Sequence, residues 1–100
     1  MGTNKLKIML SFMREIDEGN IPNAKDYDIS EKEFFNIIEV CKDEGFIKNV
    51  IDCTTLSDSY KKYLLDNVAL TFKGIKYLDD NSTMMKTYKG LKEVRSWLPF

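Results

Sequence analysis

Five polar side chains in the middle of the chain are of the types that contact nucleic acids. Lysine ammonium groups pair with backbone phosphates, and an asparagine amide can make two hydrogen bonds to the edge of an adenine. Duplex DNA is therefore one expected partner. The residues expected to contact it are Lys32, Asn36, Lys48, Lys61 and Lys62.

The charge around two of these residues opposes DNA binding. Residues 31–44 contain five acidic groups and two lysines, so that phosphates would be repelled. The arginines, which are best suited to guanine, are only two, Arg14 and Arg95. Two alternatives to DNA binding therefore stay open. One is a solvated helix face without a nucleic-acid role, and the other is a protein-interaction module whose acidic helix faces a basic partner.

Positive charge is concentrated in the second half of the chain. Residues 1–44 carry six basic and ten acidic groups, whereas residues 45–100 carry nine and six. The basic groups include the lysines at 48, 61 and 62 and a second stripe at 86, 89 and 92. Surface lysines most often serve solubility, so these clusters alone do not decide between the alternatives.

The sequence predicts no enzyme. It has no histidine, which removes the commonest general base and the commonest zinc ligand. Asp26, Asp28, Glu31 and Glu33 lack the glycine and the distal glutamate of an EF-hand loop, and the glycines do not form a phosphate-binding loop. We therefore expect no catalytic residue, no cofactor-binding residue, no metal site and no small-molecule ligand.

Composition predicts one folded domain over residues 1–100. Of its residues, 43% are hydrophobic and 31% are charged, which is ordinary for a globular protein. No apolar run approaches the length needed to cross a bilayer, and the amino terminus does not resemble a signal peptide, so the expected location is the cytoplasm. We expect both cysteines, Cys41 and Cys53, to be reduced.

The first half of the chain predicts three helical elements. Apolar residues recur at helical spacing over residues 5–18, and residues 24–27 have room for one or two turns. Ser30 and Glu33 form a capping-box pattern, with Ile29 placed for a hydrophobic staple, and they start a helix over residues 31–44. Gly45 is expected to end this helix, with Phe46 folding back on its last turn.

The second half predicts a β-hairpin and two further helices. Residues 46–53 and 67–71 are rich in β-branched residues and are expected to pair, and the segment 54–66 either carries a turn of helix or extends the second strand. Thr71 is expected to cap a helix over residues 72–79 that buries Phe72, Ile75 and Leu78. The final helix, over about residues 84–98, is expected to contact a protein partner or a second copy of the chain, with packing of Trp97 against the first helix of the same chain as the commoner alternative. The residues expected at the partner contact are Tyr88, Leu91, Trp97 and Leu98.

This order of elements is that of a winged helix, an α+β fold with three N-terminal helices, a β-hairpin wing and two C-terminal helices. In this fold the capped helix is the one usually presented to DNA. We therefore expect a winged-helix protein of the transcription-regulator type that binds DNA, or one that binds only other proteins.

Residues 70–78 (LTFKGIKYL) look like the strand-to-helix junction that follows the wing in many small bacterial regulators, and residues 43–47 (DEGFI) look like the entry to the wing. More narrowly, residues 70–78 and 80–98 resemble the carboxy-terminal half of the YjcQ family of small bacterial and phage proteins. The resemblance covers most of the chain, is sharpest over residues 70–97, and departs over residues 54–66. It implies a winged-helix-like fold and supplies no catalytic motif.

Overall fold

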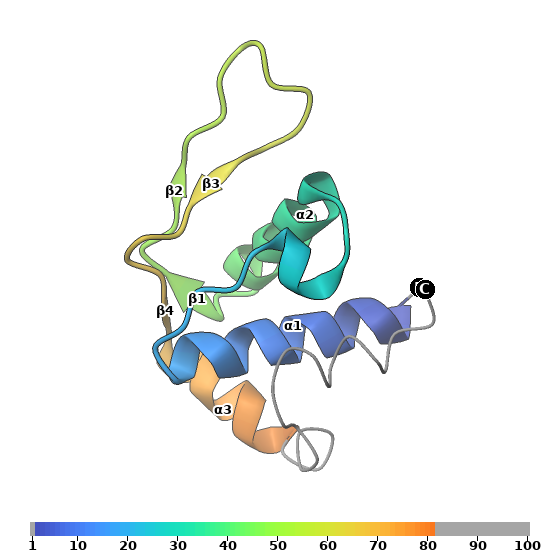
Figure 1. The fold of residues 1–100 in the computed structure, drawn as a ribbon. Coiled ribbons are helices and arrows are strands. Elements are labelled where there is room, and N and C mark those ends of the chain that lie inside the picture. Colours follow the sequence, from blue (N-terminus) through green and yellow to red (C-terminus); the bar gives the residue numbers. More distant parts are fainter. Residues whose placement is uncertain (1, 82–100) are drawn as a thin grey trace.

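A computed structural model of the chain describes residues 2–81 (Figure 1). The described part is α+β, as predicted, with three α-helices, one 3-10 turn and two antiparallel strand pairs. The predicted helix over residues 84–98 lies outside the described residues. The elements are α1 (Gly2–Asp17), η1 (Ala24–Tyr27), α2 (Glu31–Asp43), β1 (Ile47–Lys48), β2 (Ile51–Asp52), β3 (Tyr63–Leu64), β4 (Ala69–Leu70) and α3 (Phe72–Asp80).

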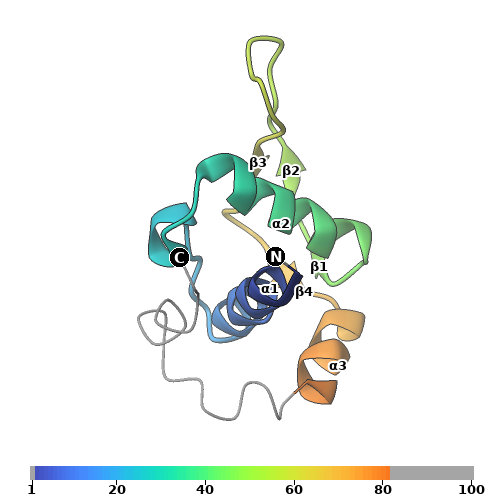
Figure 2. The same cartoon turned by 90° about the vertical axis from the view of Figure 1, so that its right-hand side faces the viewer.

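Helix α1 is the centre of the fold. It packs against α2, α3 and β4, and Figure 2 shows it nearly end-on between α2 and α3. It begins earlier than predicted, at Gly2. The apolar residues at helical spacing within residues 5–18 are buried at Met9, Leu10, Phe12, Met13 and Ile16, and the buried surface also includes Ile8 and Ser11.

Two buried polar side chains of α1 have partners in the connection to α2. Ser11 shares a hydrogen bond of 3.0 Å with the hydroxyl of Tyr27, whose pKa is raised by burial. The Glu15 carboxylate accepts a hydrogen bond of 3.1 Å from the side-chain amide of Asn20. Because unpaired polar groups are costly to bury, these bonds fix the path of the chain between α1 and α2.

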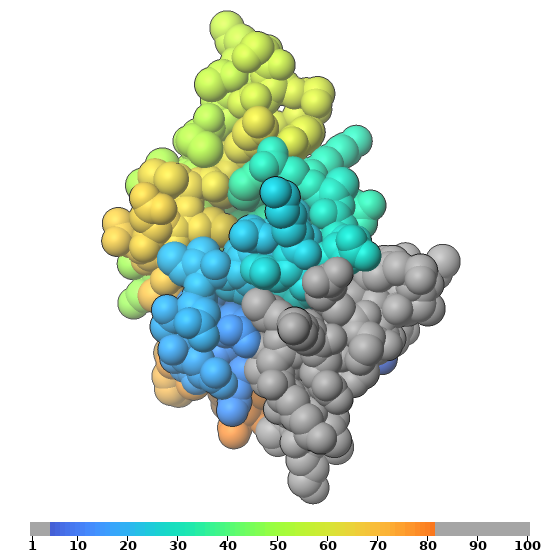
Figure 3. Space-filling model, in the orientation of Figure 1, coloured from blue at the N-terminus to red at the C-terminus, as the bar shows by residue number. Residues whose placement is uncertain are grey.

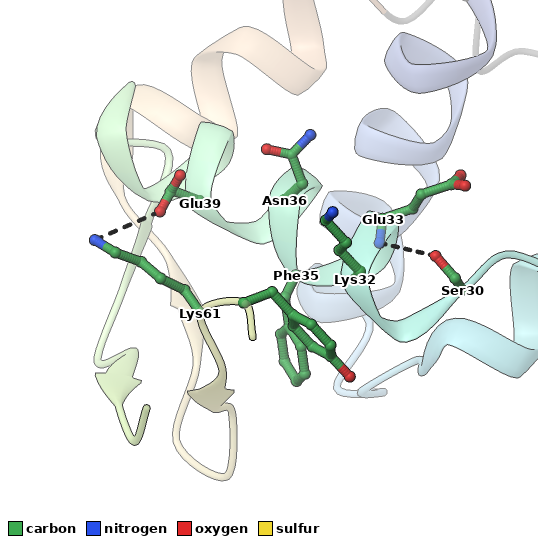
Figure 4. Close-up of a pocket in the computed structure, with 8 residues that line it drawn as sticks. Ser30, Lys32, Glu33, Phe35, Asn36, Glu39 and Lys61 are labelled. Atoms are coloured by element: carbon green, nitrogen blue, oxygen red, sulfur yellow. Dashed lines mark hydrogen bonds and ion pairs between the residues drawn. The ribbon is translucent and has the colours of Figure 1, made fainter. Parts of the chain in front are cut away.

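Both ends of α2 lie close to where the sequence places them. Ser30 Oγ accepts a hydrogen bond of 3.1 Å from the Glu33 amide, which is half of the predicted capping box. The Glu33 carboxylate does not return the bond within the described part of the chain (Figure 4). A complete box forms instead at Asn23 and Asp26, one element earlier, and the sequence prediction missed it.

Gly45 ends α2 as predicted. Its φ of 78° lies in the left-handed region, where glycine carries no Cβ penalty. The Phe46 amide donates to the Cys41 carbonyl at 2.9 Å and the Gly45 amide to the Lys42 carbonyl at 3.0 Å. These are the two bonds of a Schellman motif, which turns the chain directly into β1.

The predicted hairpin is present, but it is divided in two. β1 pairs with β4 and β2 pairs with β3, both antiparallel, with Ile47 opposite Leu70 and Ile51 opposite Leu64. The break falls at Asn49, whose φ of 64° interrupts the strand. Of the two alternatives for residues 54–66, the extended one holds, since Tyr63–Leu64 is β3. In Figure 3 the tip of the hairpin projects beyond the helices, whereas the part of the hairpin below the tip lies against α2.

The prediction for the buried face of α3 was wrong at two of three positions. Leu78 is buried, but Phe72 is 81% exposed and Ile75 is 49% exposed. The reason is the close approach of α3 to β1: a Cβ on Gly74 would lie 2.1 Å from the Phe46 carbonyl oxygen. Gly74 therefore faces inward. An α-helix turns by about 100° per residue, so Phe72, two residues before Gly74, faces the opposite side. Tyr77 also lies on the inward face of α3, and its ring stacks on the Phe46 ring with the two ring centroids 4.4 Å apart.

Candidate functional site

A groove with a volume of about 510 Å³ lies between α2 and the outer part of the hairpin (Figure 4). It brings together Lys32 and Asn36 from α2 and Lys61 from the hairpin, three of the five residues predicted to contact DNA. Lys62 lies beside the groove without lining it, and Lys48 is exposed on β1, outside the groove. The full lining is Ser30, Lys32, Glu33, Phe35, Asn36, Glu39, Tyr60 and Lys61.

Helix α2 supplies one wall of the groove. Lys32, Asn36 and Glu39 lie on one face because their spacings of four and three residues match the helical repeat. Phe35 gives an apolar surface next to them. Its ring packs edge-on against the Tyr63 ring, with the two ring centroids 6.2 Å apart. Within the described residues, the Lys32 and Asn36 side chains have no hydrogen-bond or ion-pair partner, so both are available to a ligand.

The hairpin supplies the other wall through residues 60–63, here called the tyrosine–lysine segment. Tyr60 Oη donates to Glu31 Oε1 at 2.5 Å, and Tyr63 Oη donates to Glu39 Oε2 at 3.0 Å. The two lysines between these tyrosines face the same carboxylates. Lys61 Nζ lies 3.7 Å from Glu39 Oε2, and Lys62 Nζ lies 3.7 Å from Glu31 Oε1.

These contacts change the acid–base properties of the tyrosines. Burial and the bond to Glu39 raise the pKa of Tyr63 to about 12. The hydrogen bond to Glu31 raises the pKa of Tyr60. A tyrosine hydroxyl is already protonated at neutral pH, and the raised pKa keeps both hydroxyls protonated, and donating to the carboxylates, into more alkaline solution.

The hairpin tip gives Lys62 a second anionic partner. Asp58 lies 3.4 Å from Lys62 Nζ, and this contact raises the pKa of Lys62. Asp58 is itself held by the Thr55 amide at 2.8 Å and by the Thr55 hydroxyl at 3.1 Å, and these bonds lower the pKa of Asp58. The tip thus has its own polar structure, which positions Asp58 next to Lys62.

The hairpin lysines alter the charge of the surface around α2 locally. Residues 31–44 have five acidic groups against two lysines, and Lys61 and Lys62 face two of the five, Glu31 and Glu39. The outer hairpin, residues 51–64, also brings Asp52 and Asp58, so the combined surface has seven carboxylates and four lysines. The net negative charge is therefore unchanged, and the hairpin lysines reduce the repulsion of phosphates only locally, beside Glu31 and Glu39.

Exposed apolar side chains lie on a surface of the hairpin for which the sequence predicted no partner contact. Tyr88, Leu91, Trp97 and Leu98, the predicted partner contacts, lie outside the described residues. Elsewhere Ile51 and Leu64 are 54% and 43% exposed, and they are cross-strand neighbours on the hairpin.

The site offers binding groups and little reactive chemistry. Among residues 2–81, no three metal-ligating side chains come together. Burial raises the pKa of the Cys41 thiol to about 12, so this thiol is unreactive, whereas Cys53 is exposed and unpaired. Two lysines, an amide and one tyrosine line the groove together with the carboxylates of Glu33 and Glu39, and these groups are suited to holding a polar partner in place.

No helix in the described part of the chain has the length and apolar composition needed to cross a membrane.

A family model described as "YjcQ protein" matches residues 6–97. A curated relative, "Uncharacterized protein YjcQ" from Bacillus subtilis (strain 168), is 34% identical over 96 residues, which cover 95% of this chain and 98% of the relative. No solved structure matches the chain.

Proposed function

The chain belongs to the YjcQ family, and for this member we propose a non-enzymatic, winged-helix-like protein that binds duplex DNA through the groove between α2 and the hairpin. It would act in the cytoplasm as a module of the transcription-regulator type. The observation that carries the proposal is the meeting of Lys32 and Asn36 with Lys61 in one groove, although the helix and the hairpin are far apart in the sequence.

The order of the elements supports a winged-helix-like arrangement. A central helix, a short turn, a capped helix, an antiparallel hairpin and a further helix follow one another along the chain. In winged-helix proteins the capped helix enters the major groove and the hairpin contacts the flanking backbone. Here that arrangement would place Asn36 at base edges and the hairpin lysines at phosphates.

The same surface sets the strength of the proposed binding. Lys32, Lys48, Lys61 and Lys62 are the lysines available for phosphates, and the acidic side chains beside them oppose part of that attraction. We therefore expect weak affinity that depends steeply on salt. If four lysines neutralise phosphates, log affinity should fall against log salt with a slope of about −3.6.

The test is a fluorescence anisotropy titration of a short random-sequence duplex at low and at moderate salt. The variant Lys32→Ala/Lys61→Ala should bind about tenfold more weakly or worse. The matched control is Lys25→Ala/Lys76→Ala, which removes two exposed lysines outside the groove and should change the affinity by less than about threefold. Absence of binding by the unmodified protein at low salt would exclude DNA as the ligand.

A protein-interaction module is the second candidate, and a different observation favours it. Ile51 and Leu64 form an exposed apolar pair on the hairpin, and Phe72 and Ile75 form another on α3. Exposed apolar groups of this kind are typical of protein contacts, including contacts between two copies of one chain. Multi-angle light scattering over a concentration series tests whether two copies of the chain associate. A molar mass that stays monomeric at all concentrations excludes a homodimer.

A further inference from the structure

The tyrosine–lysine segment makes the same arrangement with two carboxylates of α2. Glu31 accepts the Tyr60 hydroxyl and faces the Lys62 ammonium, while Glu39 accepts the Tyr63 hydroxyl and faces the Lys61 ammonium. A tyrosine hydroxyl with a lysine ammonium is also a common donor pair for a phosphate oxygen. Each carboxylate therefore occupies a place that a phosphate would fit.

Three of the four donors are placed so that they can exchange their partner. The side chains of Lys61 and Lys62 are 63% and 36% exposed, and the bond from Tyr60 to Glu31 lies on the surface. Both ammonium–carboxylate distances are 3.7 Å, longer than a direct hydrogen bond, so these ion pairs are weak. Tyr63 differs, since it is 5% exposed and lies against Phe35.

We propose that Tyr60, Lys61 and Lys62 form an anion-binding segment that exchanges the carboxylates of Glu31 and Glu39, which hold it against α2 in the free protein, for phosphates of duplex DNA. Asp58, which lies 3.4 Å from Lys62 within the hairpin, moves with the segment and is not exchanged. Tyr63 stays on Glu39 and keeps the hairpin in position during the exchange. This inference rests on the proposed DNA binding and adds to it an internal competitor, because every phosphate contact of the segment must first displace a carboxylate.

The spacing of the two carboxylates supports two separate places rather than one. Glu31 and Glu39 are eight residues apart, which is about 12 Å along an α-helix. One phosphate group is too small to replace both. The segment therefore has room for two phosphates of one DNA backbone, one facing Lys62 and one facing Lys61.

The variant Glu31→Gln/Glu39→Gln tests the exchange, because glutamine keeps an acceptor for each tyrosine but has no charge to hold the lysines on α2. Lys62 keeps its contact with Asp58 in this variant and in the unmodified protein, so the comparison isolates the two carboxylates of α2. Its affinity for a short random-sequence duplex should exceed that of the unmodified protein by about tenfold. The matched control is Asp43→Asn/Glu44→Gln, which removes two charges from the same stretch at exposed residues that do not line the groove and have no hydrogen bond or ion pair to the hairpin in the described part of the chain. The control should gain less than about threefold.

Adding Lys61→Ala/Lys62→Ala to the glutamine variant should abolish its gain, because the gain comes from the released lysines. A thermal melt followed by circular dichroism shows whether each variant is folded. Equal gains in the glutamine variant and its control would overturn the inference, because general charge repulsion would then explain both.

A titration with sodium phosphate, followed by the backbone amide NMR signals of residues 60–62, separates this inference from the proposed function. If no variant binds DNA but phosphate shifts these signals at lower concentration in the glutamine variant than in the unmodified protein, the anion-binding segment stands and DNA is excluded as its ligand. If neither DNA nor phosphate distinguishes the two proteins, the segment does not bind anions and the inference is wrong.

Discussion

The layer around α1 and the outer part of the hairpin are stabilised by different forces. Around α1, Leu10, Phe12 and Met13 are fully buried, so burial of apolar surface stabilises this part. The outer hairpin rests on α2 through the buried Tyr63 ring beside Phe35 and, at more exposed positions, through hydroxyl–carboxylate and ammonium–carboxylate contacts. The first kind of contact fixes the fold, whereas the second can be exchanged for contacts with a ligand.

This difference predicts how the two regions respond to substitution. Changes in the α1 layer should lower the free energy of unfolding of the whole domain. Changes in the hairpin contacts should alter binding more than global stability, because exposed ion pairs contribute little to folding.

The largest loss of stability is expected for Phe12→Ala. Phe12 is 0% exposed and its ring meets Phe34 edge to face at 5.9 Å, so the substitution leaves a cavity in the centre of the fold. Such substitutions cost about 3–5 kcal/mol. Urea denaturation followed by circular dichroism measures the loss, and Leu56→Ala at the exposed hairpin tip is the control that should change almost nothing. A loss below about 1 kcal/mol for Phe12→Ala would contradict the burial of α1.

A smaller loss is expected for Tyr27→Phe. It removes the hydroxyl that pairs with Ser11, and Ser11 is 0% exposed, so its own hydroxyl is left buried without a partner. The cost should be about 1–3 kcal/mol in the same denaturation assay. The double variant Ser11→Ala/Tyr27→Phe should recover part of the loss because neither hydroxyl then remains; if it is no more stable than Tyr27→Phe, this bond does not carry the effect.

The smallest effect is expected for Tyr63→Phe, and it should depend on pH. The variant loses the bond to Glu39, which costs about 1 kcal/mol at neutral pH. In the folded wild type the pKa of Tyr63 is raised from 10.0 to about 12, so the protonated form is favoured by folding. The stability from this group is therefore complete below its ordinary pKa and is lost as pH rises toward the folded value.

Denaturation of both proteins at a series of alkaline pH values tests this prediction. The difference in free energy of unfolding between the wild type and Tyr63→Phe should be constant up to about pH 9 and should shrink above about pH 10. A difference that stays constant to high pH would show that the ring, and not the hydroxyl, holds the hairpin on α2.

Local signals in the sequence were enough to predict the ends of α2 and the presence of the hairpin. The hydrogen bonds at Ser30 and Gly45 that end the helix join residues at most five positions apart. A short stretch of sequence is therefore enough to predict both helix ends. The buried face of α3 was not predictable in this way. It depends on the contact between Gly74 and the Phe46 backbone, and apolar spacing instead favoured Phe72.

The groove was predictable only in part. Lys32, Asn36 and Lys61 were expected from their chemical types, and the structure brings them together. The pairs Tyr60–Glu31 and Tyr63–Glu39 were missed because their members lie 29 and 24 residues apart. No periodic pattern in residues 54–66 indicated which side of the hairpin would face α2.

The two free cysteines give the molecule a built-in attachment point for a reporter. Cys41 is buried and its pKa is raised to about 12, whereas Cys53 is exposed and its backbone amide bonds to the Lys62 carbonyl at 3.0 Å. Among these two thiols, a maleimide dye at neutral pH should therefore label Cys53 selectively. Its fluorescence would report directly on the environment of Lys62 when the groove is filled, without any engineered substitution.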